Sequence, residues 1–160
     1  MTGRVSCVWQ VVKTLRPHPL SVGQARNFCT RRLTSVLDDR YDAPEVVSDA
    51  ATIASELVTN ALRAGSTEIS LSLALRPDSV YIEVEDDAVG TVAPAHPAPT
   101  DPKGRGLLVV AALSREWGVS PVEGGAKHVW AEVALTNHQD GRQPAQHPAP
   151  QSGGPDDNIS

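Results

Sequence analysis

The sequence has few cysteines, few aromatic residues, no excess of positive charge and no long apolar run. Its only cysteines, Cys7 and Cys29, lack C-x-x-C spacing, which argues against a disulfide scaffold or a zinc site and favours a reducing compartment. Aromatic residues make up 4% of the chain, so we expect an aliphatic core and few of the stacking surfaces that single-strand nucleic-acid binders use.

Charge and hydropathy exclude further classes of protein. The formal net charge of -5 and the pI of about 5.4 give no electrostatic reason to expect direct nucleic-acid binding. The longest apolar run, 107–113, is far shorter than the roughly 20 residues that a membrane span needs, and polar residues interrupt the N-terminal apolar segment. The scattered histidines show no metal-ligand spacing. We therefore expect a cytoplasmic protein without membrane association and without a metal held by protein ligands alone.

The chain length fits one domain followed by a tail. At 160 residues, the chain is long enough to bury a core. Beyond residue 136, prolines and glycines accumulate and Ile159 is the only large aliphatic residue, so this segment cannot bury enough surface to offset its ordering entropy. We predict one domain over residues 1–136 and a disordered tail over 137–160.

The strongest pattern predicts a helix over residues 43–64. Pro44 suits a first helical position and Gly65 suits the end, and apolar residues between them recur at three- and four-residue spacing. Glu56 and Asn60 lie one turn apart, so a carboxylate and a carboxamide project from the same edge of this helix. Such a pair could serve a hydrated, phosphate-bound Mg²⁺, although two polar residues on the exposed side of an amphipathic helix are also ordinary.

The remaining patterns predict an antiparallel sheet covered by helices on one face. Residues 21–38 form a second amphipathic helix, with Ser21 and Gln24 as a capping box. Alternating apolar residues in 68–75 and 80–85 flank a Pro-Asp turn and predict a hairpin with one apolar face. The other predicted elements are strands over 5–15, 117–120 and 126–135 and a short helix over 107–113.

Residues 87–103 lack any such pattern. Four prolines, Pro94, Pro97, Pro99 and Pro102, punctuate a segment that is too long for an ordinary connection. Loops of this length in a compact domain are commonly lids or binding loops, so we expect this segment to cover a ligand.

Three short motifs have the chemistry of a nucleotide site, although each also has a simpler interpretation. Asp86 opens D-D-A-V-G at a strand end, where a carboxylate can accept a hydrogen bond from an exocyclic amine and Gly90 lets a ring approach the backbone. K-G-R-G-L at 103–107 is a glycine-flanked helix start that suits a phosphate. G-G-A-K-H-V-W at 124–130 is a glycine turn before the last strand. A polar turn, a flexible hinge and a plain hairpin are the respective alternatives.

In combination and in this order, these pieces resemble the GHKL superfamily of ATP-binding domains. The similarity covers about residues 20–135 and is greatest to small bacterial histidine-kinase-like ATPase domains related to anti-sigma-factor serine kinases. Its most specific parts are E-L-V-T-N-A at 56–61, D-D-A-V-G at 86–90 and G-R-G-L-L-V-V at 104–110. The resemblance implies a Bergerat-type two-layer α/β sandwich, with a mixed, mostly antiparallel sheet and helices on one face.

The resemblance also implies roles for individual residues. Asn60 corresponds to the Mg²⁺-binding asparagine, and Glu56 to the carboxylate that polarises the attacking hydroxyl or water. Asp86 corresponds to the aspartate that recognises the adenine amino group, and Gly90 to the glycine beside the base. The remaining positions expected to contact ATP are Arg63, Lys103, Gly104, Arg105, Gly106, Leu107 and His128. The glycines in this set match the lid that wraps the phosphates.

Three positions depart from the family pattern. Ala88 stands where the motif has glycine, Ala64 where many relatives have histidine, and His128 where a threonine often supports the nucleotide. The change at His128 could weaken hydrogen bonding on the adenine side. The sequence shows no phospho-accepting histidine domain, so a complete sensor histidine kinase is not expected.

The resemblance leaves three functions open. The first is an ATP- and Mg²⁺-dependent serine/threonine kinase that phosphorylates an anti-sigma-antagonist-like protein and so regulates transcription through partner switching. The second is a nucleotide-responsive module that sequesters a regulatory partner without chemistry, and the third is a slow ATPase without a protein substrate. ATP, Mg²⁺ and an anti-sigma antagonist are the expected partners, with a sigma factor and a second copy of the chain as further candidates.

Overall fold

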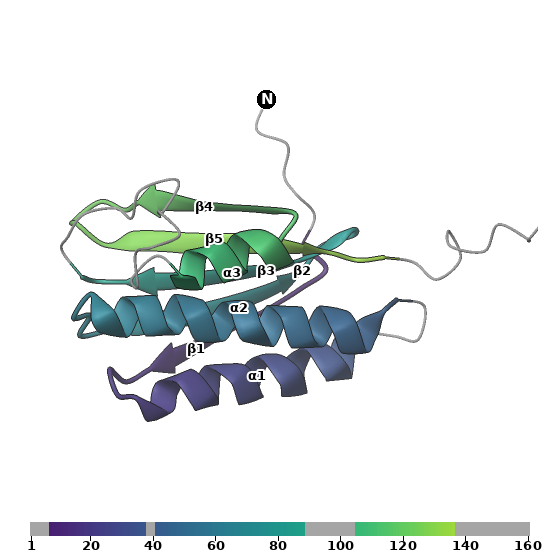
Figure 1. Cartoon of the computed structure of the whole chain (residues 1–160), viewed down its shortest axis with the longest axis horizontal. Helices are drawn as coiled ribbons and strands as arrows, with labels where there is room; N and C mark the ends of the chain where they lie inside the picture. The colour runs from purple at the N-terminus through teal and green to yellow at the C-terminus, as the bar shows by residue number, and fades with distance from the viewer. Residues whose placement is uncertain (1–6, 38–40, 89–104, 137–160) are drawn as a thin grey trace, which may run out of the picture.

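The computed structural model describes residues 7–37, 41–88 and 105–136, which form a two-layer α/β sandwich (Figure 1). One layer consists of the strands β1 (Trp9–Leu15), β2 (Ile69–Leu75), β3 (Ser79–Asp86), β4 (Glu116–Pro121) and β5 (Lys127–Ala134). They form a single sheet in the order β1-β2-β3-β5-β4, and every neighbouring pair is antiparallel. The predicted hairpin and the predicted pair of C-terminal strands are confirmed.

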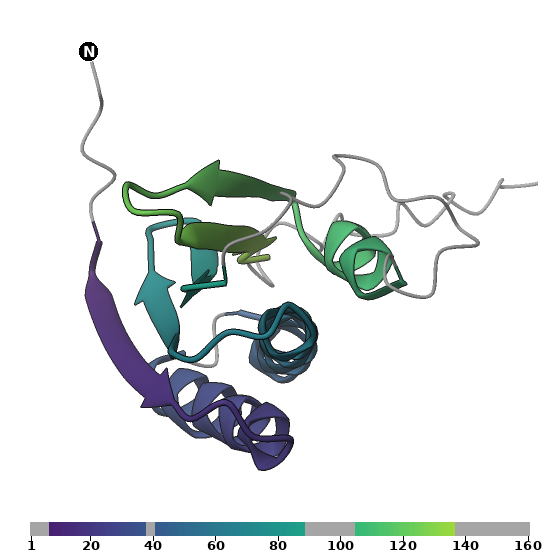
Figure 2. The ribbon, with the colours of Figure 1, turned by 90° about the vertical axis from the view of Figure 1, so that its left-hand side faces the viewer.

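The other layer consists of the helices α1 (Leu20–Val36), α2 (Ala43–Arg63) and α3 (Arg105–Leu113). All of them lie on one face of the sheet, with α2 in the middle, in contact with both other helices and with β3 (Figure 2). The predicted two-layer sandwich with helices on one face is therefore confirmed. Among the described residues, no helix combines the length and the apolar character that crossing a membrane would require.

The core lies between α2 and the helix-facing side of the sheet. Strand alternation places one apolar row on that side, and helical periodicity places the apolar stripe of α2 against it. The fully buried large side chains of these two surfaces are Ile53, Leu57, Val58, Ile69, Leu71, Leu73, Val80, Ile82 and Val84. The core is aliphatic, as expected from the low aromatic content.

Helix α2 ends as the sequence predicts. Gly65 has φ of +80°, and its N–H donates to the carbonyl of Leu62 while the N–H of Ser66 donates to that of Ala61. This pair of bonds is a Schellman motif, which satisfies the last carbonyls of a helix and turns the chain away. The chain therefore leaves α2 directly into β2.

The start of α1 differs from the prediction. The helix begins at Leu20, so Ser21 lies inside its first turn; the N-cap residue is Pro19, and the Leu20 N–H donates to Nδ1 of His18. The Ser21 hydroxyl donates to the carbonyl of Arg16 instead of accepting a bond from the helix, so the predicted capping box with Gln24 is wrong. The predicted tail over 137–160 and most of the predicted covering loop, 89–103, lie outside the described residues.

The two helix-associated glycines Gly65 and Gly23 should respond oppositely to substitution by alanine. Neither would place a Cβ within 4 Å of another group, so only backbone conformation distinguishes them. Gly65→Ala forces a left-handed residue and should lower the free energy of unfolding by roughly 1–2 kcal/mol. Gly23→Ala, inside α1, should raise it by about 0.5–1 kcal/mol. Urea denaturation measures both, and shifts in the same direction would contradict the role of Gly65 in ending α2.

Candidate functional site

The predicted polar pair lies on the central helix. Glu56 and Asn60 are both half-buried, while their neighbours Leu57, Val58 and Ala61 are buried against the sheet. The buried stripe fixes the rotation of α2 about its axis. Glu56 and Asn60 are therefore held at the edge of the buried face of the helix and cannot rotate away from it.

The first turn of α3 lies directly against this pair. A Cβ atom at Gly106 would be 2.7 Å from Oε2 of Glu56 and 3.4 Å from Oδ1 of Asn60. At the shorter distance the flexible end of the Glu56 side chain would have to move, so glycine at position 106 lets the α3 backbone come this close while that carboxylate keeps its position. Residues about 50 positions apart in the sequence therefore meet at one point, as expected from the motifs that contain Glu56, Asn60 and Gly106.

The N-terminus of α3 adds a positive dipole end to this point. The first N–H groups of a helix have no intrahelical partner, and α3 has no acidic residue in its first turn to compensate them. Arg105 begins the helix and is exposed, whereas Leu107 is 4% exposed and belongs to the core. An anion bound to these amides would lie opposite the side-chain oxygens of Glu56 and Asn60 on α2.

Asp86 is buried at the end of β3 and is tied to the end of α2. Its side chain is 2% exposed. Oδ1 accepts a hydrogen bond from the Ala88 N–H and lies 3.0 Å from the Ser66 hydroxyl, which is also 2.8 Å from the carbonyl of Ala61. The Lys127 ammonium lies 3.9 Å from Oδ2. Oδ1 is thus used for positioning, and Oδ2 can accept a hydrogen bond from a ligand.

Asp87, the residue after Asp86, has a structural role. Its carboxylate accepts hydrogen bonds from the backbone N–H groups of Thr67 and Glu68 and from the Thr67 hydroxyl. The Thr67 hydroxyl, followed by the Glu68 amide, lowers the pKa of Asp87 below its ordinary value. These bonds hold the end of β3 against the start of β2 and so orient the strand end that carries Asp86.

Lys127, rather than His128, is the residue that the last strand brings to Asp86. Val129 belongs to the core, so strand alternation places Lys127 on the same, helix-facing side and His128 on the other. His128 Nε2 lies 2.9 Å from Glu85 Oε2, and its Nδ1 lies 3.6 Å from Glu83 Oε1, on the helix-free face. Alternation along β5 is the sequence signal that identifies Lys127, which was not among the predicted site residues.

The remaining predicted site residues are only partly described. Arg63 is exposed in the last turn of α2, one turn beyond Asn60. Gly90, Lys103 and Gly104 lie outside the described residues. The described part of the chain contains no group of three or more His, Cys, Asp or Glu side chains that could hold a metal ion. The Asn60 carboxamide could offer one oxygen to a cation at this site, and oxygens of a bound ligand could complete its coordination.

Taken together, these groups suit a phosphorylated, amine-bearing ligand. Glu56 offers a base, Asn60 a neutral oxygen, α3 the amides of its first turn and Asp86 an acceptor for an amine. Comparison with known proteins agrees with this chemistry. The sequence matches the family model of the histidine kinase-like ATPase domain over residues 19–133.

A solved structure has a similar fold. It is the crystal structure of the RsbU and RsbW domains of Rv1364c from Mycobacterium tuberculosis, with a TM-score of 0.60 and 20% sequence identity. The similarity covers 80% of this chain and 33% of that one, so the protein spans about a third of the length of that relative. No curated protein sequence matches this chain.

The contact between α3 and Glu56 can be tested without a ligand, by a double-mutant cycle. In a Glu56→Ala background, Gly106→Ala should raise the free energy of unfolding by up to about 1 kcal/mol, the difference in helix propensity. In the wild type, the new methyl group must displace the Glu56 carboxylate, so the gain should be smaller or reversed. Urea denaturation of the four proteins should give a coupling energy of at least about 0.5 kcal/mol.

The matched control is Gly23→Ala in the same two backgrounds. Gly23 lies in α1, and a methyl group added there would have no other group within 4 Å, so its effect should be independent of Glu56. Additive effects of Gly106→Ala and Glu56→Ala would mean that α3 does not approach α2 as described.

Proposed function

The chain belongs to the histidine kinase-like ATPase domain family, and on this premise we propose that it is an ATP- and Mg²⁺-binding regulatory kinase. Its substrate is a serine or threonine hydroxyl of a small anti-sigma-antagonist-like protein. The kind of partner rests on the resemblance of the motifs at 56–61, 86–90 and 104–110 to anti-sigma-factor serine kinases.

The observation that carries this proposal is the close approach of Gly106 to Glu56 and Asn60. It supports a common site for the candidate base, the candidate Mg²⁺ ligand and the amides of a helix N-terminus. Phosphoryl transfer requires mainly positioning and charge neutralisation, so this small set of groups is sufficient.

Each group has a separate task in the proposed reaction. The partner's hydroxyl oxygen attacks the γ-phosphorus of bound ATP, the bond from that phosphorus to the β–γ bridging oxygen breaks, and ADP leaves; Mg²⁺ would neutralise the charge of the phosphates. Glu56 accepts the proton of the attacking hydroxyl, and the Asn60 oxygen is the protein ligand that Mg²⁺ would use. The amides of the first turn of α3 hold phosphate oxygens. Oδ2 of Asp86 accepts a hydrogen bond from the adenine amino group, and Lys127 on the same face of the sheet limits the cost of burying that carboxylate.

Adenine recognition by Asp86 is testable with a pair of nucleotides. Asp86→Asn should weaken ATP binding by roughly 1–3 kcal/mol, because an amide NH₂ presented to the adenine amine mispairs a buried polar contact. Inosine triphosphate has a carbonyl in place of that amine, so the preference of the wild type for ATP over inosine triphosphate should shrink in the variant. Isothermal titration calorimetry with Mg²⁺ measures both affinities.

Asp78→Asn is the matched control for this change. Asp78 lies in the β2–β3 turn and is exposed, so its replacement should leave both affinities unchanged. Thermal melting should first establish that Asp86→Asn is folded, because Asp86 also accepts structural hydrogen bonds. Equal affinity of wild type and folded Asp86→Asn for ATP would remove the adenine assignment.

The role of Glu56 as the base distinguishes a kinase from a binding module. Glu56→Gln keeps the shape of the side chain but removes its basicity, so transfer should fall by about 10²–10⁴-fold while ATP affinity changes little. The measurement is transfer of labelled γ-phosphate to a coexpressed partner, with calorimetry for binding. Glu45→Gln, an exposed position in the first turn of α2, is the control and should transfer normally.

The same assay decides against the proposal if the wild type is inactive. Tight ATP binding without transfer to any candidate partner would identify a nucleotide-responsive module that sequesters its partner. Release of phosphate without a protein acceptor would identify a slow ATPase.

A further inference from the structure

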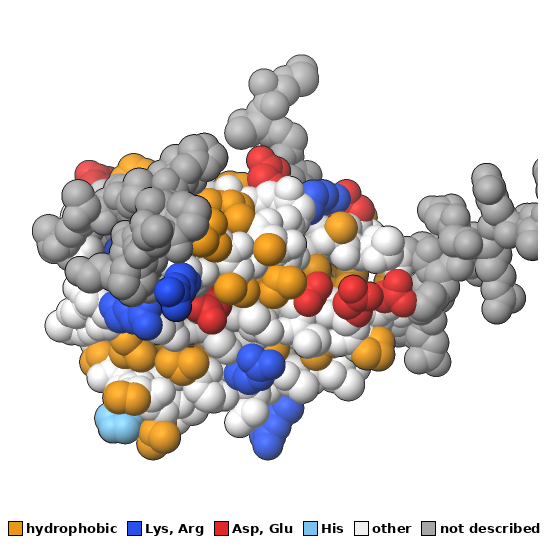
Figure 3. All heavy atoms as spheres, in the orientation of Figure 1, with side chains coloured by type: hydrophobic (Ala, Val, Ile, Leu, Met, Phe, Trp, Pro, Cys, Tyr) orange, Lys and Arg blue, Asp and Glu red, His pale blue; other side chains and the backbone are white. Residues whose placement is uncertain are grey.

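The charges of this acidic protein are unevenly divided along the chain. The first 37 residues contain six of the 14 lysines and arginines and none of the 19 aspartates and glutamates. In the described structure this part of the chain is β1 and α1, at one side of the molecule. On the face drawn in Figure 3, the surface over α1 shows basic side chains and no acidic ones, whereas acidic side chains gather over other elements.

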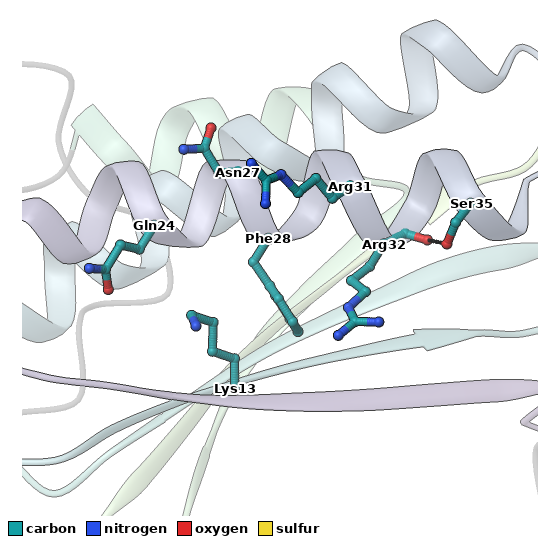
Figure 4. A pocket seen from close by; sticks show the side chains of 7 residues that line it. All are labelled: Lys13, Gln24, Asn27, Phe28, Arg31, Arg32 and Ser35. Atoms are coloured by element: carbon teal, nitrogen blue, oxygen red, sulfur yellow. Dashed lines mark hydrogen bonds between the residues drawn. The ribbon is translucent and has the colours of Figure 1, made fainter.

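Three of these basic side chains, those of Lys13, Arg31 and Arg32, line a groove between β1 and α1 (Figure 4). A cavity of about 640 Å³ is lined by Lys13, Gln24, Asn27, Phe28, Arg31, Arg32 and Ser35. Lys13 points from β1 toward α1, and Phe28 and Arg32 point from α1 toward β1. The Lys13 ammonium and the Arg32 guanidinium each lie 5.8 Å from the centre of the Phe28 ring. The floor of the groove is thus an aromatic ring between two cations.

The cations of this groove have no acidic partner in the described part of the chain. Arg76 directly after β2, Arg115 directly before β4 and Lys127 at the start of β5 all form ion pairs with carboxylates. Among the described residues, by contrast, no carboxylate pairs with Lys13, Arg31 or Arg32. Unpaired like charges that converge on one groove repel each other, and an anionic ligand removes that repulsion.

The shape of the groove indicates an extended ligand. A second cavity of about 530 Å³, lined by Thr14, Arg16, His18, Leu20, Ser21 and Gln24, adjoins it at the start of α1, with Gln24 common to both. Together they follow α1 over most of its length, on the order of 20 Å at the helical rise per residue. An extended polypeptide covers that length with roughly six to eight residues. The carboxamides of Gln24 and Asn27 can bond to peptide groups, and β1, at the edge of the described sheet, has an outer row of peptide groups that pair with no strand among the described residues.

We propose that the groove between β1 and α1 binds an acidic, extended segment of a partner protein. Carboxylates of the segment pair with Lys13, Arg31 and Arg32, and an apolar side chain rests on Phe28. Arg and carboxylate groups form strong, oriented hydrogen bonds, which favours carboxylates spaced along a chain. The site lies on the α1 side of the molecule, whereas Glu56, Asn60 and Gly106 lie between α2 and α3, so it does not depend on the proposed kinase activity.

Nucleic acid fits this groove less well than a polypeptide. Binding a phosphate backbone requires a basic surface that neutralises many phosphates at once. Here all 19 acidic residues follow the first 37 residues, so a nucleic acid that extends beyond the groove meets a surface of its own sign. A short acidic peptide ends before it reaches that surface.

Fluorescence anisotropy with a labelled peptide tests the proposal. The probe is a fluorescein-labelled peptide of about eight residues in which glutamate alternates with alanine, matched to the groove length, and its partner replaces each glutamate by glutamine. The wild type should bind the glutamate peptide in low salt and lose it in high salt, and should not bind the glutamine peptide. Arg32→Gln should weaken binding at least about fivefold, and Arg31→Gln with Arg32→Gln more strongly.

Two matched variants separate the groove from general charge. Arg26→Gln removes an exposed arginine of α1 that does not line the groove, and Arg105→Gln removes one at the start of α3. Both should change the affinity less than about twofold, because distant exposed charges contribute little. Circular dichroism should show the wild-type fold in all variants, since the substituted side chains are exposed.

Several outcomes would overturn the proposal. These are equal binding of the two peptides, equal losses in Arg26→Gln and Arg32→Gln, or no binding of the glutamate peptide. A labelled oligothymidylate of equal charge that binds more tightly than the peptide, with the same sensitivity to Arg32→Gln, would identify a phosphate polymer as the ligand instead. A loss of peptide binding in Arg105→Gln would place the peptide at the α2–α3 site.

Discussion

The central position of α2 is the constraint on which the rest of the structure depends. This helix is packed against the sheet and in contact with both α1 and α3, so its buried aliphatic stripe can face in only one direction. That orientation decides where Glu56 and Asn60 point. The close approach of Gly106 then follows from having no side chain at the position where α3 crosses this edge. Packing of the apolar face of α2 thus positions its polar groups Glu56 and Asn60, which contribute little to stability themselves.

The strand ends are organised from the same helix. Ser66, directly after the Schellman turn that ends α2, lies within hydrogen-bond distance of both the Ala61 carbonyl and Asp86. Asp87 holds the neighbouring backbone of Thr67 and Glu68. A displacement at the C-terminal end of α2 would therefore move the buried carboxylate of Asp86 as well. Hydrogen bonds thus connect the helix end and the strand end beside the candidate nucleotide site.

The positively charged side chains are paired with carboxylates in one part of the described structure and not in another. The cations of the sheet are neutralised by carboxylates, as in the cluster of Arg76, Arg115 and Glu132. Lys13 of β1 and Arg32 of α1 both lie at the Phe28 ring, and neither pairs with a carboxylate among the described residues. A pair that is satisfied within the fold stabilises the fold, whereas an unsatisfied set raises the affinity for an external anion. The candidate nucleotide site and the basic groove are in this way chemically distinct surfaces on different sides of α2.

The sequence by itself determined the elements, because helical and strand periodicity are local properties of the backbone. The helix over 43–63, its end at Gly65, the β2–β3 hairpin and the spacing of Glu56 and Asn60 follow from it. Only the tertiary structure decided that Ser21 bonds to Arg16 rather than capping α1, that Lys127 rather than His128 reaches Asp86, and that Arg32 faces Lys13 across a groove. Each of these is a contact between residues of different segments, and such contacts depend on how the helices and strands pack together.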